Sequence, residues 1–137
     1  MVSIQIEQIH PALTWRIRQE AMYPDKTLND VKLEHDHDGI HFGLYAGDQL
    51  TSVVSLFEDG DTCQFRKFAT LPESQGKGYG GLLLVHIINY NRKNGIKKLY
   101  CNARISATAF YTKYGFRQTN KTWTDKGFDF VIMELAL

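Results

Sequence analysis

Acidic side chains are missing from a long stretch in the second half of this 137-residue chain. Residues 74 to 124 contain no Asp or Glu, yet they carry nine of the 16 Lys and Arg residues. Residues 1 to 73, in contrast, hold 12 of the 15 acids. An acid-free, base-rich half favours a polyanionic ligand, and the acidic first half then favours a cationic second ligand.

Cysteines and long apolar runs are also scarce. The two cysteines, Cys63 and Cys101, have neither a Cys-x-x-Cys motif nor metal-ligand spacing, which is typical of reduced, buried thiols in a cytoplasmic protein. No apolar run is long enough to cross a bilayer, and the first residues lack the basic leader and apolar run of a signal peptide, so we expect no membrane association. His35 and His37 lie in a polar turn without a distant third ligand, so we also expect no metal.

The composition that remains is that of an ordinary folded protein. Hydrophobic residues make up 43% of the chain and charged residues 23%, so we do not expect intrinsic disorder. A chain of this length can bury a proper core, so we expect one domain over residues 1–137.

The apolar spacing predicts an α+β protein with a mixed sheet. Segment 23–39 is polar and ambiguous, although Thr27 is placed to cap a short helix there. Gly47-Asp48 has the spacing of a tight hairpin turn. The expected order is strand 3–9, helix 11–22, strands 40–46, 50–58 and 62–71, a long helix from residue 82 to 94, strand 97–102, helix 106–114, and strands 116–121 and 128–135.

A glycine-rich turn links the central strand to the long helix. Four of the six residues from Gly76 to Gly81 are glycine. Such a turn leaves backbone N–H groups uncovered, and the dipole of the following helix adds partial positive charge at the same place. The turn is therefore a candidate phosphate cradle.

Two known phosphate motifs fit this turn poorly. Gly76-x-Gly78-x-x-Gly81 satisfies the dinucleotide fingerprint, but three antiparallel strands precede it and no acid follows at the ribose position. A nucleoside triphosphate loop would end in Lys-Ser or Lys-Thr, and that pair is missing.

The segment Gln75-Gly76-Lys77-Gly78-Tyr79-Gly80 resembles the Arg/Gln-x-x-Gly-x-Gly/Ala motif of the GNAT N-acetyltransferase superfamily. Leu71-Pro72 before it, and Ala107-x-x-Phe110-Tyr111-x-x-x-Gly115-Phe116 after the next strand, extend the resemblance over essentially the whole chain. It implies the GNAT-type acyl-CoA N-acyltransferase fold. In that fold a mostly antiparallel sheet of six to seven strands splays between its fourth and fifth strands and is flanked by helices.

The resemblance also implies acetyl-CoA as co-substrate. The pantetheine arm would pair with main-chain groups at the splay, the thioester carbonyl would meet an N–H near Ala69, and the diphosphate would bind the glycine turn. Arg104 stands where many relatives have Asn, and its charge suits the phosphates. The cofactor-binding residues expected from the resemblance are Phe68, Ala69, Thr70, Gln75, Gly76, Lys77, Gly78, Tyr79, Gly80, Gly81, Arg104 and Phe110.

Tyr111 is the expected catalytic acid, because by resemblance its hydroxyl lies near the sulfur and a phenol can protonate a departing thiolate. Phe110 beside it is expected to face the core. Some relatives use a Glu as base on the central strand, but the matching residue here is Gln64, which cannot serve. The substitutes left open are Glu58, Glu73, His41 and Asp129, acting through water.

Two functions stay open. The first is direct transfer of an acetyl group from acetyl-CoA to an amine of a small molecule or protein in a ternary complex. The second is a non-catalytic coenzyme A sensor or interaction module on the same fold. Nucleic-acid binding is disfavoured because the basic residues are spread over the chain without an aromatic platform on which bases could stack.

The excess of acidic residues in the first half of the chain favours a cationic acceptor, and a homodimer is kept open. An apolar wall for the acceptor is expected from Trp15, Tyr23, Trp123, Phe128 and Phe130.

Overall fold

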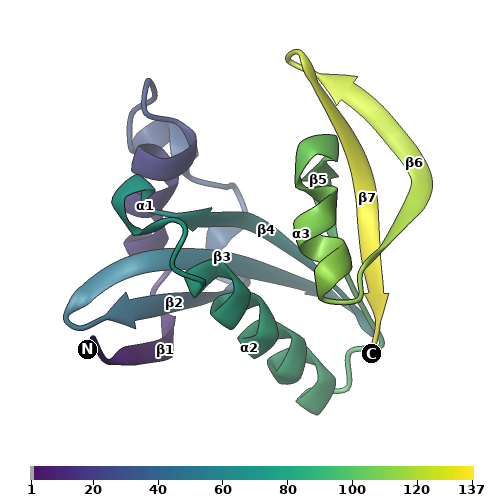
Figure 1. Cartoon of the computed structure of the whole chain (residues 1–137), viewed down its shortest axis with the longest axis horizontal. Helices are drawn as coiled ribbons and strands as arrows, with labels where there is room; N and C mark the ends of the chain where they lie inside the picture. The colour runs from purple at the N-terminus through teal and green to yellow at the C-terminus, as the bar shows by residue number, and fades with distance from the viewer. Residues whose placement is uncertain (1) are drawn as a thin grey trace. The chain divides into compact units, whose positions relative to one another are not determined.

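The computed structural model describes residues 2–137. Over these residues it has seven strands and three α-helices, with four short 3-10 helices between them (Figure 1). In chain order the elements are β1 (Ile4–Ile9), α1 (Ala12–Met22), η1 (Asn29–Val31), η2 (Asp36–Asp38), β2 (Ile40–Ala46), β3 (Gln49–Asp59), β4 (Thr62–Thr70), η3 (Pro72–Ser74), α2 (Tyr79–Lys93), β5 (Lys98–Arg104), η4 (Ile105–Ala107), α3 (Thr108–Lys113), β6 (Arg117–Asp125) and β7 (Phe128–Ala136).

The seven strands form one mixed sheet in the order β1-β2-β3-β4-β5-β7-β6. The pairs β1–β2, β2–β3, β5–β7 and β6–β7 are antiparallel, whereas β4 and β5 are parallel. The parallel register joins Thr62–Gln64 to Lys98–Tyr100 and ends there in the described chain, although both strands continue. This confirms the mixed, mostly antiparallel sheet and the splay between its fourth and fifth strands.

The described residues divide into two compact units, which we treat separately. Unit 1 takes in the described residues up to Phe57 together with Arg66–Ile87, and unit 2 takes in Glu58–Phe65 together with Ile88–Leu137. The single domain expected over residues 1–137 stays a prediction.

In unit 1, neighbouring residues of a strand point to opposite faces of the sheet, as the two-residue period of a strand requires. Phe42 of β2 meets the ring of His86 of α2, with ring centroids 4.9 Å apart. On the other face, Ile17 of α1 packs with Val53, Ala69 and Leu71 in a buried cluster. Helices α1 and α2 accordingly cover opposite faces of these strands (Figure 1).

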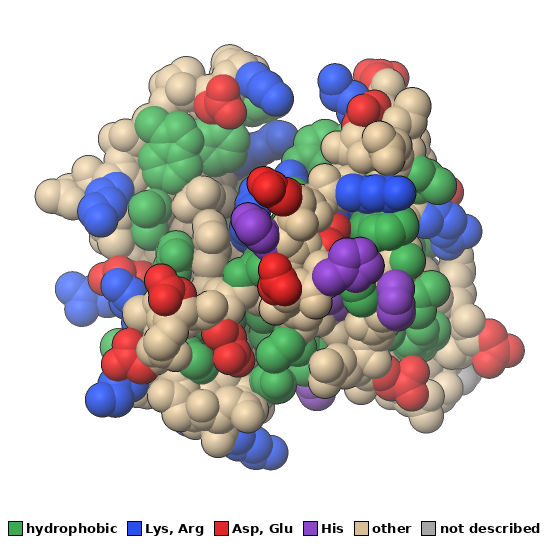
Figure 2. All heavy atoms as spheres, turned by 180° about the vertical axis from the view of Figure 1, so that it is seen from behind, with side chains coloured by type: hydrophobic (Ala, Val, Ile, Leu, Met, Phe, Trp, Pro, Cys, Tyr) green, Lys and Arg blue, Asp and Glu red, His purple; other side chains and the backbone are tan. Residues whose placement is uncertain are grey.

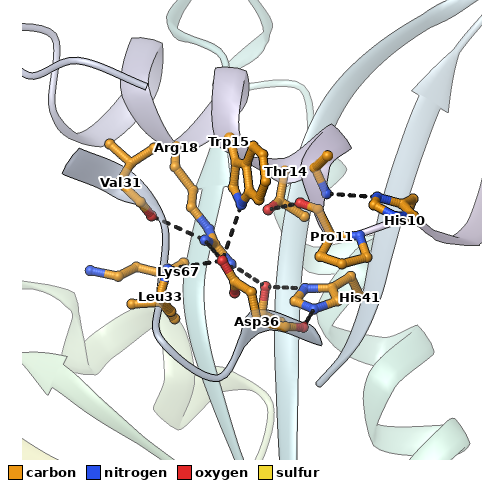
Figure 3. Close-up of polar contacts among 12 residues, drawn as sticks. His10, Pro11, Thr14, Trp15, Arg18, Val31, Leu33, Asp36, His41 and Lys67 are labelled. Atoms are coloured by element: carbon orange, nitrogen blue, oxygen red, sulfur yellow. Dashed lines mark hydrogen bonds and ion pairs between the residues drawn. The ribbon is translucent and has the colours of Figure 1, made fainter. Parts of the chain in front are cut away.

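A buried ion pair ties the polar segment 23–39 to the rest of unit 1 (Figure 3). Arg18 of α1 is fully buried, and its guanidinium donates two hydrogen bonds to the Asp36 carboxylate at 2.8 and 2.9 Å. Burial alone would raise the pKa of Asp36, but hydrogen bonds from Arg18, the Leu33 N–H and Trp15 outweigh it and lower the pKa to about 2. Asp36 is therefore ionised and holds its segment onto α1.

His41 extends this network, which removes it from the candidate catalytic bases. Its Nε2–H donates to the Asp36 carbonyl at 2.7 Å, so its Nδ1 accepts from the Ser55 hydroxyl, also at 2.7 Å (Figure 3). The Ser55 oxygen in turn accepts from Arg18 Nη2. Burial lowers the pKa of His41, so the imidazole is neutral and both its nitrogens are engaged.

Unit 2 is an antiparallel arrangement of β5, β7 and β6. Buried side chains alternate along the two inner strands, with Cys101 and Ala103 on β5 opposite Met133 and Val131 on β7, and the buried Leu99 is paired with the half-buried Leu135. Strand β6 is exposed over most of its length. Cys63 and Cys101 form no disulfide within the described chain, and both are buried, as expected. Among the described residues, no helix is both long and apolar enough to span a membrane.

The buried, neutral His41 predicts an acid-sensitive fold. Its folded pKa lies below that of an unfolded histidine, about 6.5, so the unfolded chain binds more protons just below that pH. Stability from this residue is complete above about pH 6.5 and declines as the pH falls toward the folded pKa. Urea unfolding should therefore show a lower midpoint at about pH 5.5 than at about pH 7.5, and His41→Gln should flatten that difference.

His35→Gln is the matched control, because the His35 side chain is 73% exposed. It should retain the wild-type difference between the two pH values. An equal pH dependence in the wild type and in His41→Gln would contradict the assignment. The contribution of Asp36 to stability changes only at lower pH, between its ordinary pKa of 3.8 and its folded pKa of about 2, so it does not affect the comparison of pH 5.5 with pH 7.5.

Candidate functional site

The glycine turn of unit 1 presents its backbone openly. Gly76 and Gly78 have φ angles of 78° and 84°, a left-handed conformation that residues with a Cβ adopt only with strain. A Cβ added to either glycine would meet no atom within 4 Å. Glycine is therefore required here by the backbone conformation, and the space on that side is open to a ligand.

Helix α2 begins directly after this turn. The Leu82 N–H donates to the Gly78 carbonyl at 3.2 Å, which closes the first helical turn. The N–H groups before Leu82 have no helical acceptor, and the first turn carries no acid. Gln75, Lys77 and the two turn glycines are exposed, Tyr79 and Gly80 are half-buried, and Gly81 is buried. The turn thus joins orphan N–H groups to the positive end of a 15-residue helix.

The end of β4 is held by side chains of its own unit. The Ser52 hydroxyl of β3 donates to the Ala69 carbonyl at 3.1 Å and lies 2.8 Å from the Thr70 hydroxyl. Gln75 Nε2 donates to the Thr70 carbonyl at 3.0 Å. Gln75, expected beside the diphosphate, thus ties the turn to the strand. The carbonyls of Ala69 and Thr70, two of the main-chain groups expected to pair with the pantetheine arm, thus each accept a hydrogen bond from a side chain.

Tyr111 of α3, in unit 2, is half-buried and lies against other aromatic rings. Its ring lies 5.8 Å from that of Phe65 and 5.9 Å from that of Phe116, and burial raises the pKa of its hydroxyl above the ordinary value of 10. Within residues 2–137 this hydroxyl makes no hydrogen bond, so its proton is available to a ligand. Burial also raises the pKa of the nearby Cys101 thiol to about 12.

The expectation that Phe110 faces the core is wrong. Phe110 is 38% exposed, and the inward position on α3 belongs to Tyr111. Adjacent helical residues point about 100° apart, so only one of the two can face the strands, and the polar tip of tyrosine does not prevent it from doing so.

Arg104 lies at the end of β5, and its guanidinium stacks over the Phe128 ring, 4.0 Å from the centroid. Trp123 and Phe130 stack on each other with centroids 5.6 Å apart. These residues belong to unit 2. The other two aromatics expected in an acceptor wall belong to unit 1, where Trp15 donates to Asp36 and Tyr23 contacts Lys67.

The four candidate bases differ in whether their side chains are already engaged in contacts within the protein. His41 is internal, and Asp129 accepts a hydrogen bond from the Thr124 hydroxyl at 2.7 Å. Glu58 and Glu73 are exposed and form no ion pair within the described chain. Gln64 is the last residue of β4 to pair with β5.

The contact of Lys67 with Tyr23 in unit 1 is among the arrangements that sequence reasoning missed. Lys67 Nζ donates to the Tyr23 hydroxyl at 2.6 Å, and Lys67 has a φ of 53° inside a strand. Nothing in the local sequence signals either feature, because lysine neither favours this conformation nor marks a partner 44 residues away.

The sheet is mixed, and its central strands β4 and β5 pair in parallel over a short stretch. Between these two strands, a glycine turn leads into helix α2. This arrangement is that of the acyl-CoA N-acyltransferase fold class. The family described as "Acetyltransferase (GNAT) domain" matches residues 17–137. The chain therefore belongs to the GNAT acetyltransferase family.

Individual proteins agree with this placement. The chain is 23% identical over 133 residues to the uncharacterized N-acetyltransferase YitI of Bacillus subtilis strain 168, covering 90% of this chain and 89% of that protein. Among solved structures, the IAA acetyltransferase of Bacillus cereus ATCC 14579 superposes with a TM-score of 0.81 at 23% identity, covering 98% of this chain and all of that one. A GNAT family acetyltransferase of Elizabethkingia anophelis, solved with acetyl-CoA bound, gives a TM-score of 0.77 at 22% identity and covers 98% of both chains.

A matched pair of glycine substitutions tests the turn as a coenzyme A site. Gly76 and Gly95 have the same φ of 78°, and an added Cβ meets no atom within 4 Å at either position. Gly76→Ala and Gly95→Ala should each lower the free energy of unfolding by about 1 kcal/mol, because alanine is strained at that φ. Only Gly76→Ala should also weaken coenzyme A binding, by about tenfold, measured by titration calorimetry. Equal coenzyme A affinities in the two variants would exclude the turn as the phosphate site.

Proposed function

We propose that this protein transfers an acetyl group from acetyl-CoA to a primary amine. The observation that carries the proposal is the open, glycine-built turn at the start of α2 in a chain of the GNAT family. The fold relative from Elizabethkingia anophelis, which was solved with acetyl-CoA bound, supports the same donor.

The donor would be bound mainly by main-chain groups. The N–H groups from Gly76 to Gly81 are suited to the diphosphate, with the exposed Lys77 ammonium adding charge. The main chain of Phe68, Ala69 and Thr70 is suited to the pantetheine arm, which would add to it like a further strand. Arg104 and Phe110 are assigned to the donor by the family motif alone.

The reaction would proceed by direct attack. The amine nitrogen forms a bond to the thioester carbon, and the oxyanion that develops is stabilised by the N–H near Ala69. The C–S bond then breaks, the electron pair leaves on sulfur, and the thiolate would take a proton from the Tyr111 hydroxyl, a role that the family motif alone assigns. Burial raises the pKa of Tyr111, so the phenol stays protonated over the whole working pH range.

The amine must lose a proton to attack, and Gln64 cannot accept one. The exposed carboxylates Glu58 and Glu73, acting through water, are the proposed route, since His41 is engaged inside unit 1. A cytoplasmic location is supported by the two buried cysteines, which form no disulfide within the described chain. A homodimer stays an open prediction.

A non-catalytic coenzyme A module is the second candidate function. Gln64 at the family's base position favours it, because a binding module needs no proton acceptor. The uncommitted hydroxyl of Tyr111 favours the enzyme, because a purely structural tyrosine gains nothing from a half-buried donor without a partner.

Conservative substitution of Tyr111 separates these functions. Tyr111→Phe should lower kcat about 100-fold and leave the Kd for acetyl-CoA unchanged, because only the proton donor is lost. The kcat is measured as the rate at which free thiol is released from acetyl-CoA in the presence of a panel of primary amines. Tyr114→Phe is the matched control: Tyr114 directly follows α3, three residues after Tyr111, and this variant should retain wild-type kcat.

An unchanged kcat in Tyr111→Phe would exclude Tyr111 as the acid. A panel without thiol release, combined with tight acetyl-CoA binding, would favour the non-catalytic module instead.

A further inference from the structure

Lys67 lies in a strained conformation in the interior of β4. Among the described residues with a side chain, only Lys67 and Lys126 have a positive φ, at 53° and 51°. Lys126 precedes Gly127 in the hairpin between β6 and β7, where such a φ is usual. Lys67 has no turn to explain it, and a left-handed residue inside a strand is typical of a β-bulge, which redirects side chains near functional sites.

The redirected side chain meets Tyr23, the residue that ends α1. Lys67 Nζ donates to the Tyr23 hydroxyl at 2.6 Å and lies 4.7 Å from the centre of the tyrosine ring. Both residues are half-buried, and Lys67 forms no ion pair within the described part of the chain. Since the tyrosine oxygen accepts from the ammonium, its own O–H remains free to donate.

The pair therefore offers two kinds of donor and one positive charge without a counter-charge. A half-buried ammonium held only by a phenol and a ring face is incompletely satisfied, and an anion would complete it. The pair also lies close to the expected reaction centre. Lys67 is two residues from Ala69, about 7 Å along a strand, and an N–H near Ala69 is the group assigned to the thioester carbonyl.

We propose that Lys67 and Tyr23 bind a carboxylate of the acceptor, so that the acetylated amine belongs to an amino acid or a similar amine that carries a carboxylate. The inference rests on the proposed transfer of an acetyl group. It makes the ammonium and the phenol specificity determinants, since they select the acceptor and take no part in proton transfer.

The acid-rich first half had favoured a cationic acceptor, and the structure weakens that argument. Asp36 is neutralised internally by Arg18, and Asp30 is hydrogen-bonded to Thr27. On the face shown in Figure 2, acidic side chains lie scattered among basic, histidine and apolar ones and do not form a patch. The surface charge on that face thus provides no concentrated site for a polycation.

The test compares amino acids with their amides as acceptors, which differ in the carboxylate. For the wild type, kcat/KM should be at least about tenfold higher for the acid than for the matching amide. In Lys67→Asn the ratio should fall to about one, because asparagine tolerates the left-handed φ while removing the charge. Tyr23→Phe should reduce the ratio less. Lys126→Asn is the control for the same φ and the same residue change, and it should keep the wild-type ratio.

A second measurement needs no turnover. With coenzyme A bound, N-acetylalanine should shift the amide NMR signals of Tyr23 and Lys67 in a saturable way, whereas N-acetylalaninamide should not. Lys67→Asn should abolish these shifts.

The outcomes distinguish the two proposals. Carboxylate binding without thiol release from any amine would overturn acetyl transfer but leave the anion site standing. Thiol release with polyamines, together with no carboxylate binding, would overturn the anion site and leave the transferase. A preference for amides, or an acid preference that Lys67→Asn retains, would also overturn it.

Discussion

The arrangement depends on one constraint in β4. Its ladder with β5 ends at Gln64, yet the strand continues for six further residues, among them the left-handed Lys67. These residues need hydrogen-bond partners, because unpaired main-chain groups in a protein interior are costly. Ser52 and Gln75 supply two of them at Ala69 and Thr70. The strand end is thus held in place without its parallel neighbour, and it delivers the chain into the glycine turn at a fixed position.

The fixed position of the strand end also fixes the main-chain N–H groups of the glycine turn. Leu71 is anchored by its N–H to the Thr51 carbonyl at 2.8 Å, and only eight residues later α2 begins at Tyr79. The positive φ angles of Gly76 and Gly78 let the backbone turn within that distance while leaving their outer side uncovered. An anion placed there meets main-chain donors whose positions are set by a buried strand and a long helix. Such preorganised donors bind a diphosphate without ordering flexible side chains.

Most of the helices and strands could be predicted from the sequence, because they depend on local patterns of apolar and turn residues. Helix α1 and the hairpin of β2 and β3 follow from apolar spacing and turn residues. Thr27 is expected to cap η1, but the N-cap position there is Leu28, and the Thr27 hydroxyl, one residue before it, only accepts from the Asp30 N–H. Strand β6 is longer than expected, reaching Asp125, because Trp123 is held there by stacking on Phe130. That contact is set by the register of β6 with β7, which no local pattern shows.

The features that escaped prediction are all pairings or conformations fixed by tertiary context. Arg18 reads as one polar residue of an amphipathic helix, yet it is the centre of a buried network because Asp36 lies opposite it. The same network engages His41, which local sequence leaves free to act as a base. Lys67 adopts a conformation that lysine disfavours, and only the surrounding strands can impose it. The family motif locates the donor site, whereas these residues shape the rest of unit 1.

The most direct test of the account is a titration of the isotopically labelled protein with coenzyme A, followed by backbone amide NMR. The account predicts saturable shifts at the amides of Gly76, Gly78 and Gly81 and at those of Phe68 to Thr70. The amides of the hairpin glycines Gly60 and Gly127, which also have positive φ, should not move. Shifts confined to residues outside the turn and the end of β4, or no shifts at all, would contradict it.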